Sequence, residues 1–307
     1  MFSGVKLIED VTMIEQPAGC EPIHCAALLR KVDGELIVLL RLLRADEWDL
    51  QTIAPRWKVR DVAAHLLDTA LRKLSLVRDS WWVENANSHP ATEDLFAGTL
   101  NPQSAEEVVG LVNRLNREGV TVYRRLSPAL LIEMMMMASA QSANFHESLD
   151  PFARAAFNVS WAGEETSLNW FDTARELTER WHHQQQIRLA TGRPGIMTRE
   201  LYFPVLDCFL RGLPHAYRDV SALEGSSIHI EISGECGGSW VLSKGAEGWR
   251  FLDRFPETMA CKVTLPQAIA WRVFTKGIDR NVAREQSQVE GDSGLAEHVF
   301  GLTAIVG

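Results

Sequence analysis

Residues 179–194 read ERWHHQQQIRLATGRP, and this stretch decides the fold of the first two thirds of the chain. It has the features expected at the end of a long helix. Gly192 suits a left-handed C-terminal cap, and Pro194 prevents the helix from continuing. We therefore predict a helix that starts at residue 166 or 167 and runs to about residue 190.

This helix carries a candidate pair of metal ligands. Glu179 and His183 are four residues apart, so their side chains lie on one face. A carboxylate oxygen and an imidazole nitrogen are normal zinc ligands. The third ligand has to come from another helix, and His65 is the best candidate because it lies on the apolar side of a predicted helix.

Other interpretations of the same residues remain open. An isolated Glu-x-x-x-His pair is more often a solvated pair on a helix surface, and a lone buried histidine is more often a core residue with one hydrogen bond. Glu176 is an alternative carboxylate on nearly the same face as Glu179. His182 points about 100° around the helix from His183 and is not expected to join the site.

The rest of the first two thirds is also predicted to be helical. Apolar residues at steps of three and four indicate core-facing stripes, and Ser104 with Glu107 forms a candidate capping box. The run Met134–Met137 lies in a less regular stretch and is typical of flexible core filling rather than of a cofactor site. The predicted helices of a four-helix bundle are 24–43, 59–82, 104–122 and 166–190.

The character of the sequence changes after about residue 198. Short alternating segments separated by a glycine-rich turn predict strands, and two later apolar segments predict helices. The predicted strands are 228–232, 239–242 and 249–252, and the predicted helices are 265–274 and 293–305. We expect one domain at 20–197 and a small α+β domain at 198–307.

Composition excludes some classes of function. The 307 residues carry a formal net charge of -9 without a basic block, which argues against binding to nucleic acid or to an anionic membrane. No window has the roughly 20 apolar residues of a membrane span. The five cysteines form no Cys-x-x-Cys pair and are expected to be free thiols, so we predict a cytoplasmic protein.

Two sequence blocks resemble the mycothiol-dependent maleylpyruvate isomerase family, a branch of the DinB-like metal-binding bundles. Residues 57–66 read WKVRDVAAHL and are similar to the family's entry to its second helix, and 179–194 is similar to its E-x-x-x-H helix. Residues 289–292, VEGD, resemble the close of the family's sterol-carrier-like domain. The implied fold is an α plus α/β two-domain protein, with a DinB-like four-helix bundle and a small sterol-carrier-like α+β domain.

The resemblance implies metal ligands at His65, Glu179 and His183, with Zn²⁺ or another divalent metal as cofactor. It also implies a low-molecular-weight thiol as cosubstrate and a small electrophilic or unsaturated acid as substrate. The reaction would be cis–trans isomerisation or S-transfer through a metal-activated thiolate. Two positions depart from the family pattern: Lys58 replaces the usual Thr or Ser cap, and Gln186 replaces a frequent Asp.

The family also uses an arginine from the C-terminal domain, and Arg280 or Arg284 are the catalytic candidates here. An acidic substrate would need cationic side chains around it, and Arg60 and Arg180 are also available for this role. The alternative hypothesis is a non-catalytic protein that binds a metal and a small ligand, and a third is a sensor. Thiol-dependent turnover would separate the first hypothesis from the other two.

Overall fold

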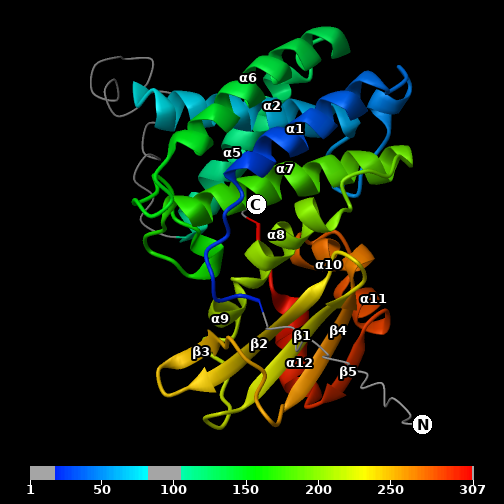
Figure 1. Ribbon diagram of the computed structural model, residues 1–307. Coiled ribbons are helices and arrows are strands. Elements are labelled where there is room, and N and C mark those ends of the chain that lie inside the picture. Colours follow the sequence, from blue (N-terminus) through cyan, green and yellow to red (C-terminus); the bar gives the residue numbers. More distant parts are fainter. Residues whose placement is uncertain (1–17, 82–104, 306–307) are drawn as a thin grey trace, which may run out of the picture.

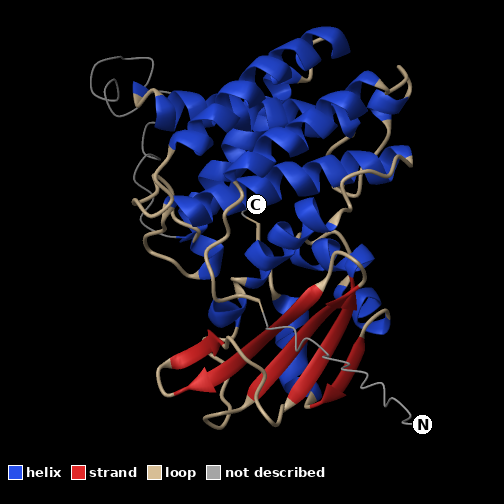
Figure 2. Ribbon diagram, viewed as in Figure 1, coloured by secondary structure: helices blue, strands red, loops and turns tan. Residues whose placement is uncertain are grey.

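The computed structural model describes residues 18–81 and 105–305, and it divides into a helical part and a part built on one sheet (Figures 1 and 2). The longer helices of the first part are α1 (Ala26–Arg41), α2 (Val59–Lys73), α5 (Ala105–Tyr123), α6 (Pro128–Ser148) and α7 (Asn169–Thr191). The helices that follow are α8 (Arg199–Leu210), α9 (Leu213–Ala216), α10 (Gln267–Phe274), α11 (Arg280–Glu285) and α12 (Ser293–Gly301). None of the described helices combines the length and apolar character needed to cross a membrane.

Four helices, α1, α2, α6 and α7, form the bundle. Each packs against two others around a closed ring, whereas α5 packs mainly on α2. The third bundle helix is therefore α6, and our assignment of that place to residues 104–122 is wrong. The run Leu130–Ala140 is apolar on almost every side, with Leu130, Met136 and Met137 exposed, so no single stripe marked it as a helix.

The two helices of the candidate site begin and end as local chemistry requires. At the start of α2, a carboxylate oxygen of Asp61 accepts a hydrogen bond from the backbone N–H of Lys58 at 3.0 Å, which is half of a capping box. At the end of α7, Gly192 adopts the left-handed conformation with φ of 64°, as predicted. The candidate capping box of Ser104 and Glu107 lies outside the residues whose side chains are described.

The second helix does not continue to residue 82 as an α-helix. At Leu74 the α-helix changes into a π-helical segment (η2, Leu74–Arg78). At the end of this segment the N–H of Asp79 donates a hydrogen bond to the carbonyl of Leu74. Two short 3₁₀ helices, η1 (Glu47–Asp49) and η3 (Ser160–Ala162), lie in the loops of the same part. The π segment itself packs against α6.

The second part is a five-stranded mixed sheet with helices packed on it. The strands are β1 (Ser227–Ser233), β2 (Gly238–Gly245), β3 (Gly248–Phe251), β4 (Cys261–Pro266) and β5 (Gln288–Gly291), in the order β3-β2-β1-β4-β5. Only the β1–β4 pair is parallel among these neighbours. Helices α9, α10 and α12 contact the sheet. The predicted α+β class is confirmed.

The structure corrects two predicted helices in this part: the helix expected at 293–305 ends at Gly301, and the helix expected at 265–274 begins two residues later. Leu265 and Pro266, expected at the start of a helix, end strand β4, and the helix α10 begins only at Gln267. Pro266 has extended backbone angles, and its missing N–H suits a strand end that turns into a helix. Strands β4 and β5 were not predicted, although in β4 Cys261, Val263 and Leu265 alternate with polar residues as in a half-buried strand.

One apolar cluster joins the bundle to the sheet. Trp181 of α7 stacks on Tyr202 of α8 with ring centroids 4.3 Å apart and meets Trp271 of α10 edge-on at 6.0 Å. All three are buried together with the inner residues of β1 and β4. The domain boundary at residue 197 falls between α7 and α8 and stays a prediction, since apolar packing is continuous across it.

The start of the described chain is also tied to the sheet. Ala18 forms a parallel bridge with Trp240 of β2, and its N–H donates to the carbonyl of Ser239 at 2.7 Å. Gly19 follows with φ of 108°, and an added Cβ there would lie 3.0 Å from the rings of Phe251 and Trp240. The chain therefore leaves the sheet through a position that requires glycine before it enters α1.

Candidate metal centre

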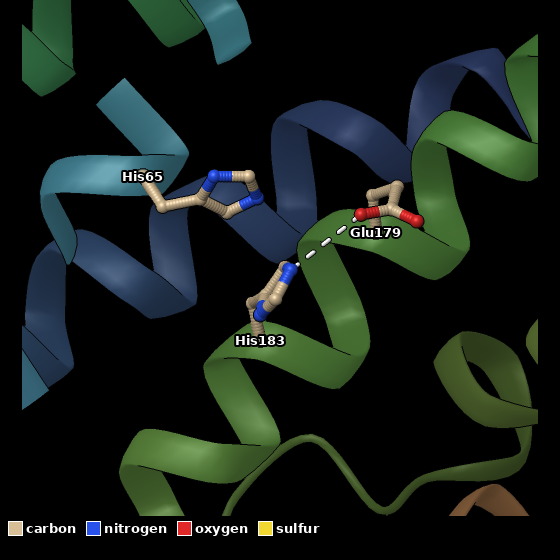
Figure 3. Close-up of side chains that lie close together, drawn as sticks. All are labelled: His65, Glu179 and His183. Atoms are coloured by element: carbon tan, nitrogen blue, oxygen red, sulfur yellow. Dashed lines mark ion pairs between the residues drawn. The ribbon is translucent and has the colours of Figure 1, made fainter. Parts of the chain in front are cut away.

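Two helices bring the three predicted ligands together. Glu179 and His183 lie one turn apart on α7, with Oε2 and Nε2 3.5 Å from each other, and His65 reaches them from α2 (Figure 3). One ligand atom from each residue lies within 4.8 Å of the other two. The antiparallel register of the two helices is fixed further along, where Nζ of Lys73 meets Oδ2 of Asp172 at 2.6 Å.

The donor set fits a divalent metal ion. The ligand atoms around a tetrahedral zinc ion lie about 3.4 Å from one another. The three ligand atoms here lie within 4.8 Å of one another, so small side-chain rotations would bring them to the separations that zinc requires. The carboxylates Asp172 and Glu176 on the same helix already pair with lysine or arginine. Glu179 pairs with a histidine instead, and a cation at this point would balance its charge.

Protonation states favour the same interpretation. Burial lowers the pKa of His65 well below its ordinary value, and the nearby charges of His183 and Arg72 lower it further. Burial raises the pKa of Glu179, but its hydrogen bond with His183 and the surrounding charges outweigh this and leave the pKa below its ordinary range. At neutral pH the site therefore presents a neutral His65 and an ionised carboxylate, the forms that bind a metal.

An outer residue orients one ligand. The Nδ1–H of His183 donates to Oε1 of Gln186 at 3.0 Å, so with an ion bound beside Glu179 the other nitrogen, Nε2, would offer its lone pair to that ion. In the sequence, Gln186 stands out only as a departure from the family pattern. Its position three residues after His183 indicates that the two side chains are neighbours on the helix surface.

A tryptophan covers the two histidines. The ring of Trp57 lies 4.6 Å from His65 and 5.6 Å from His183 between centroids. The loop before α2 holds Trp57 in place, because its carbonyl accepts hydrogen bonds from the side chains of Gln51 and Thr52. Trp57 thus removes one side of the site from water, a role that the sequence did not reveal.

The two alternative residues on α7 have other partners. Glu176 lies 3.1 Å from Nε of Arg180, so its carboxylate is already neutralised. The Nδ1–H of His182 donates to the carbonyl of Thr178 at 2.8 Å. The ring of His182 packs 3.9 Å from that of His183 between centroids, yet His182 is not among the three residues whose ligand atoms converge.

The arginines expected for an acidic substrate mostly have local partners. Arg60 pairs with Asp49 at 3.2 Å, and Arg180 is buried between Asp33, Glu176 and Ser142. In the second part, Nε of Arg284 lies 3.0 Å from Glu297, and Arg280 is exposed beside Gly301. These contacts leave Arg60, Arg180 and Arg284 engaged away from the three converging side chains.

Two other arginines act on the site directly. The charge of Arg72 lowers the pKa of His65, after burial and His183, and the charge of Arg175 is one of those that hold down the pKa of Glu179. Arg72 follows His65 by seven residues and Arg175 precedes Glu179 by four, so each shares a helix face with a candidate ligand. Sequence reasoning missed both, although this spacing was available.

The comparisons with known proteins agree with the fold. The sequence model of the mycothiol maleylpyruvate isomerase N-terminal domain matches residues 29–188, which include all three converging residues. A crystal structure of a histidine-to-alanine mutant of the mycothiol-dependent maleylpyruvate isomerase covers 86% of this chain and 91% of its own, with 12% identity and a TM-score of 0.50.

A second crystal structure, of the mycothiol-dependent maleylpyruvate isomerase itself, covers 81% of this chain and 86% of its own, with 13% identity and a TM-score of 0.47. No curated protein sequence matches the chain. At these identities the structural likeness speaks for the arrangement of the chain alone, and the match of the family's sequence model covers 29–188.

Proposed function

The chain belongs to the family of the mycothiol maleylpyruvate isomerase N-terminal domain, and we propose that it is a metal-dependent enzyme that uses a low-molecular-weight thiol. His65, Glu179 and His183 would hold the ion, with Zn²⁺ as the first candidate. The observation that carries this proposal is the convergence of two imidazoles and a carboxylate, within 4.8 Å, at a place shielded by Trp57.

Three protein ligands leave one position of a tetrahedral ion open, and an ion so held lowers the pKa of a thiol placed there. The protein residues supply the surroundings. Gln186 fixes the ring of His183, and Trp57 excludes water. Arg72 and Arg175 hold down the pKa values of the ligands, but each is paired with an aspartate, Asp68 or Asp172. Arg280 and Arg284 remain proposed as catalytic arginines from the second part.

Cis–trans isomerisation is the reaction we favour. The thiolate adds to one carbon of a cis double bond, the former double bond rotates as a single bond, and the thiolate leaves again with the trans isomer released. S-transfer to an electrophile shares the first bond-forming step and is the second candidate. The family name, which refers to mycothiol and maleylpyruvate, supports the first of these for the present chain.

We also propose a cytoplasmic location without nucleic-acid or membrane partners. The net charge of -9 is unfavourable for binding phosphate-rich surfaces, and the five cysteines are free thiols, as in a reducing compartment. A small unsaturated acid and a small thiol would then be the only partners that the reaction requires.

The test is metal content together with turnover. We expect about one zinc per chain in the purified protein and mycothiol-dependent isomerisation of maleylpyruvate. Both should be lost in Glu179→Ala and in His65→Ala, whereas His182→Ala should keep its metal. A protein that binds one zinc but shows no thiol-dependent turnover would instead be the non-catalytic metal- and ligand-binding protein. Full metal content in His65→Ala would disprove the site.

A further inference from the structure

Three consecutive glutamines, Gln184, Gln185 and Gln186, follow the candidate ligand His183 on α7, and they are not equivalent. Both amide atoms of Gln184 are buried without a hydrogen-bond partner, and so is Oε1 of Gln185. Gln186, which is only 6% exposed, has its Oε1 3.0 Å from Nδ1 of His183. Only this member of the run contacts one of the three converging side chains through a described hydrogen bond.

The two histidines of the centre are held in different ways. The Nδ1 of His183 is engaged by Gln186, so the ring has a defined rotation and directs Nε2 towards Glu179 and the position of the proposed ion. The Nδ1 of His65 is buried without a hydrogen-bond partner, and its ring is held by packing against Trp57. The centre therefore has one ligand oriented by a hydrogen bond and one oriented by ring contact.

We infer that Gln186 is the positioning residue of the metal centre, and that its neutral amide keeps His183 a weaker electron donor than a carboxylate in the same place would. The inference rests on the proposed metal site. The physical reason is that the partner of the outer imidazole N–H fixes the tautomer and sets the basicity of the ligating nitrogen. A carboxylate accepts that N–H more strongly than an amide oxygen does.

The experiment compares zinc affinity, by competition with a chromophoric chelator, in the full-length protein and three variants. Gln186→Met keeps the volume of the side chain but removes the acceptor, and we expect zinc affinity to fall by roughly 10- to 100-fold. Gln186→Glu should bind zinc at least as tightly as the parent protein. Gln185→Met, one residue away and without contact to a ligand histidine, should stay within about twofold, well below the outer-residue effect.

A spectroscopic measurement separates positioning from general damage. With Co²⁺ in place of zinc, the visible absorption reports the ligand field, so Gln186→Glu should shift the band while Gln185→Met should not. If Gln186→Met does not fold, the cobalt spectrum of Gln186→Glu still tests the inference. Zinc affinity and cobalt spectra unchanged in both Gln186 variants would overturn the inference but leave the proposed function standing. Parent protein that binds neither metal would overturn both.

Discussion

The interior of the bundle and the interior of the sheet are built from different side chains. Helix α7 buries a run of ionisable groups in the bundle, among them Asp172, Glu176, Arg180, His182 and His183. The sheet buries apolar side chains on its inner face, namely Ile228, Ile230, Ile232, Val263 and Leu265. The bundle thus combines ionisable groups with an apolar cluster of its own, whereas the sheet interior is mainly apolar, and the aromatic cluster around Trp181 joins the two.

The difference indicates that the bundle buries charged groups for a functional reason, at a cost in stability. Taking a charge out of water costs several kcal/mol even in a paired state, and an apolar replacement of a buried ion pair is often as stable or more so. The sheet needs no such arrangement, because apolar burial alone supports it. The ionic interior of α7 is therefore best explained by the two ligands that it carries, which need ionised and oriented neighbours.

The largest change in the free energy of unfolding is expected when a buried lysine ion pair is broken, and a more exposed ion pair of the same length serves as the comparison. Lys73 and Asp172 are 2.6 Å apart and both buried, whereas Lys262 and Glu231 in the sheet are also 2.6 Å apart but about one-third exposed. We expect Lys73→Met to lower the free energy of unfolding by about 3 kcal/mol, the low end of the range for breaking a buried ion pair, since Asp172 loses Lys73 but keeps Arg175.

The matched variant Lys262→Met should change the free energy of unfolding by only about 0–1 kcal/mol. Urea denaturation of the two metal-free variants measures both values under the same conditions. Equal losses in the two variants would mean that the ionic interior of the bundle is not energetically distinct from the surface of the sheet.

A smaller effect is expected from pH. Burial lowers the pKa of His146 on α6 to about 3, with smaller contributions from its charged neighbours. A histidine with a lowered folded-state pKa binds fewer protons than in the unfolded chain, so its stabilisation is complete above about pH 6.5 and is lost as the pH falls towards 3. The metal-free protein should lose about 2–3 kcal/mol from this group between pH 7 and pH 4.5.

His146→Gln should flatten the stability profile over that range, measured by denaturant unfolding at a series of pH values. Asp33 acts in the opposite direction, because burial raises its pKa to about 6 in spite of Arg180. A steeper profile in His146→Gln than in the parent would contradict the prediction. A control substitution in the sheet, His229→Gln, tests whether any histidine in the protein has the same effect.

The smallest expected effect lies in the second part. The side chain of Asp292 caps α12 by accepting hydrogen bonds from the N–H groups of Gly294 and Leu295 at 2.8 and 3.1 Å. Asp292→Ala should cost about 1 kcal/mol, the usual value for a helix N-cap. Thermal unfolding measures the loss, and zinc affinity should be unchanged; a variant with weakened zinc binding would show that the two cores are not independent.

Local signals were sufficient to predict α7 and the start of α2, because helix period, a glycine cap and an i,i+4 pair can be read within one segment. The ligand set that joins His65 to Glu179 and His183 rested on the family resemblance, since their convergence from two helices is not a local signal. Local signals failed at α6, whose apolar residues do not form a stripe, and so the wrong segment was assigned to the bundle.

Trp57, Arg72 and Arg175 were missed for other reasons. Trp57 contacts histidines of two different helices, which is not a local signal. The spacing of Arg72 and Arg175 from a ligand is local, but it does not distinguish them from solvated arginines on a helix surface.

The bridge between Ala18 and Trp240 has a consequence for synthesis on the ribosome. Ala18 precedes its strand partner by 222 residues (240 − 18), so the N-terminal segment is made long before β2 exists. At roughly 5–20 residues per second, this wait is on the order of 10–45 s. The bundle helices have time to assemble first, and the segment at Ala18 is then held by a strand that is synthesised only after the last bundle helix.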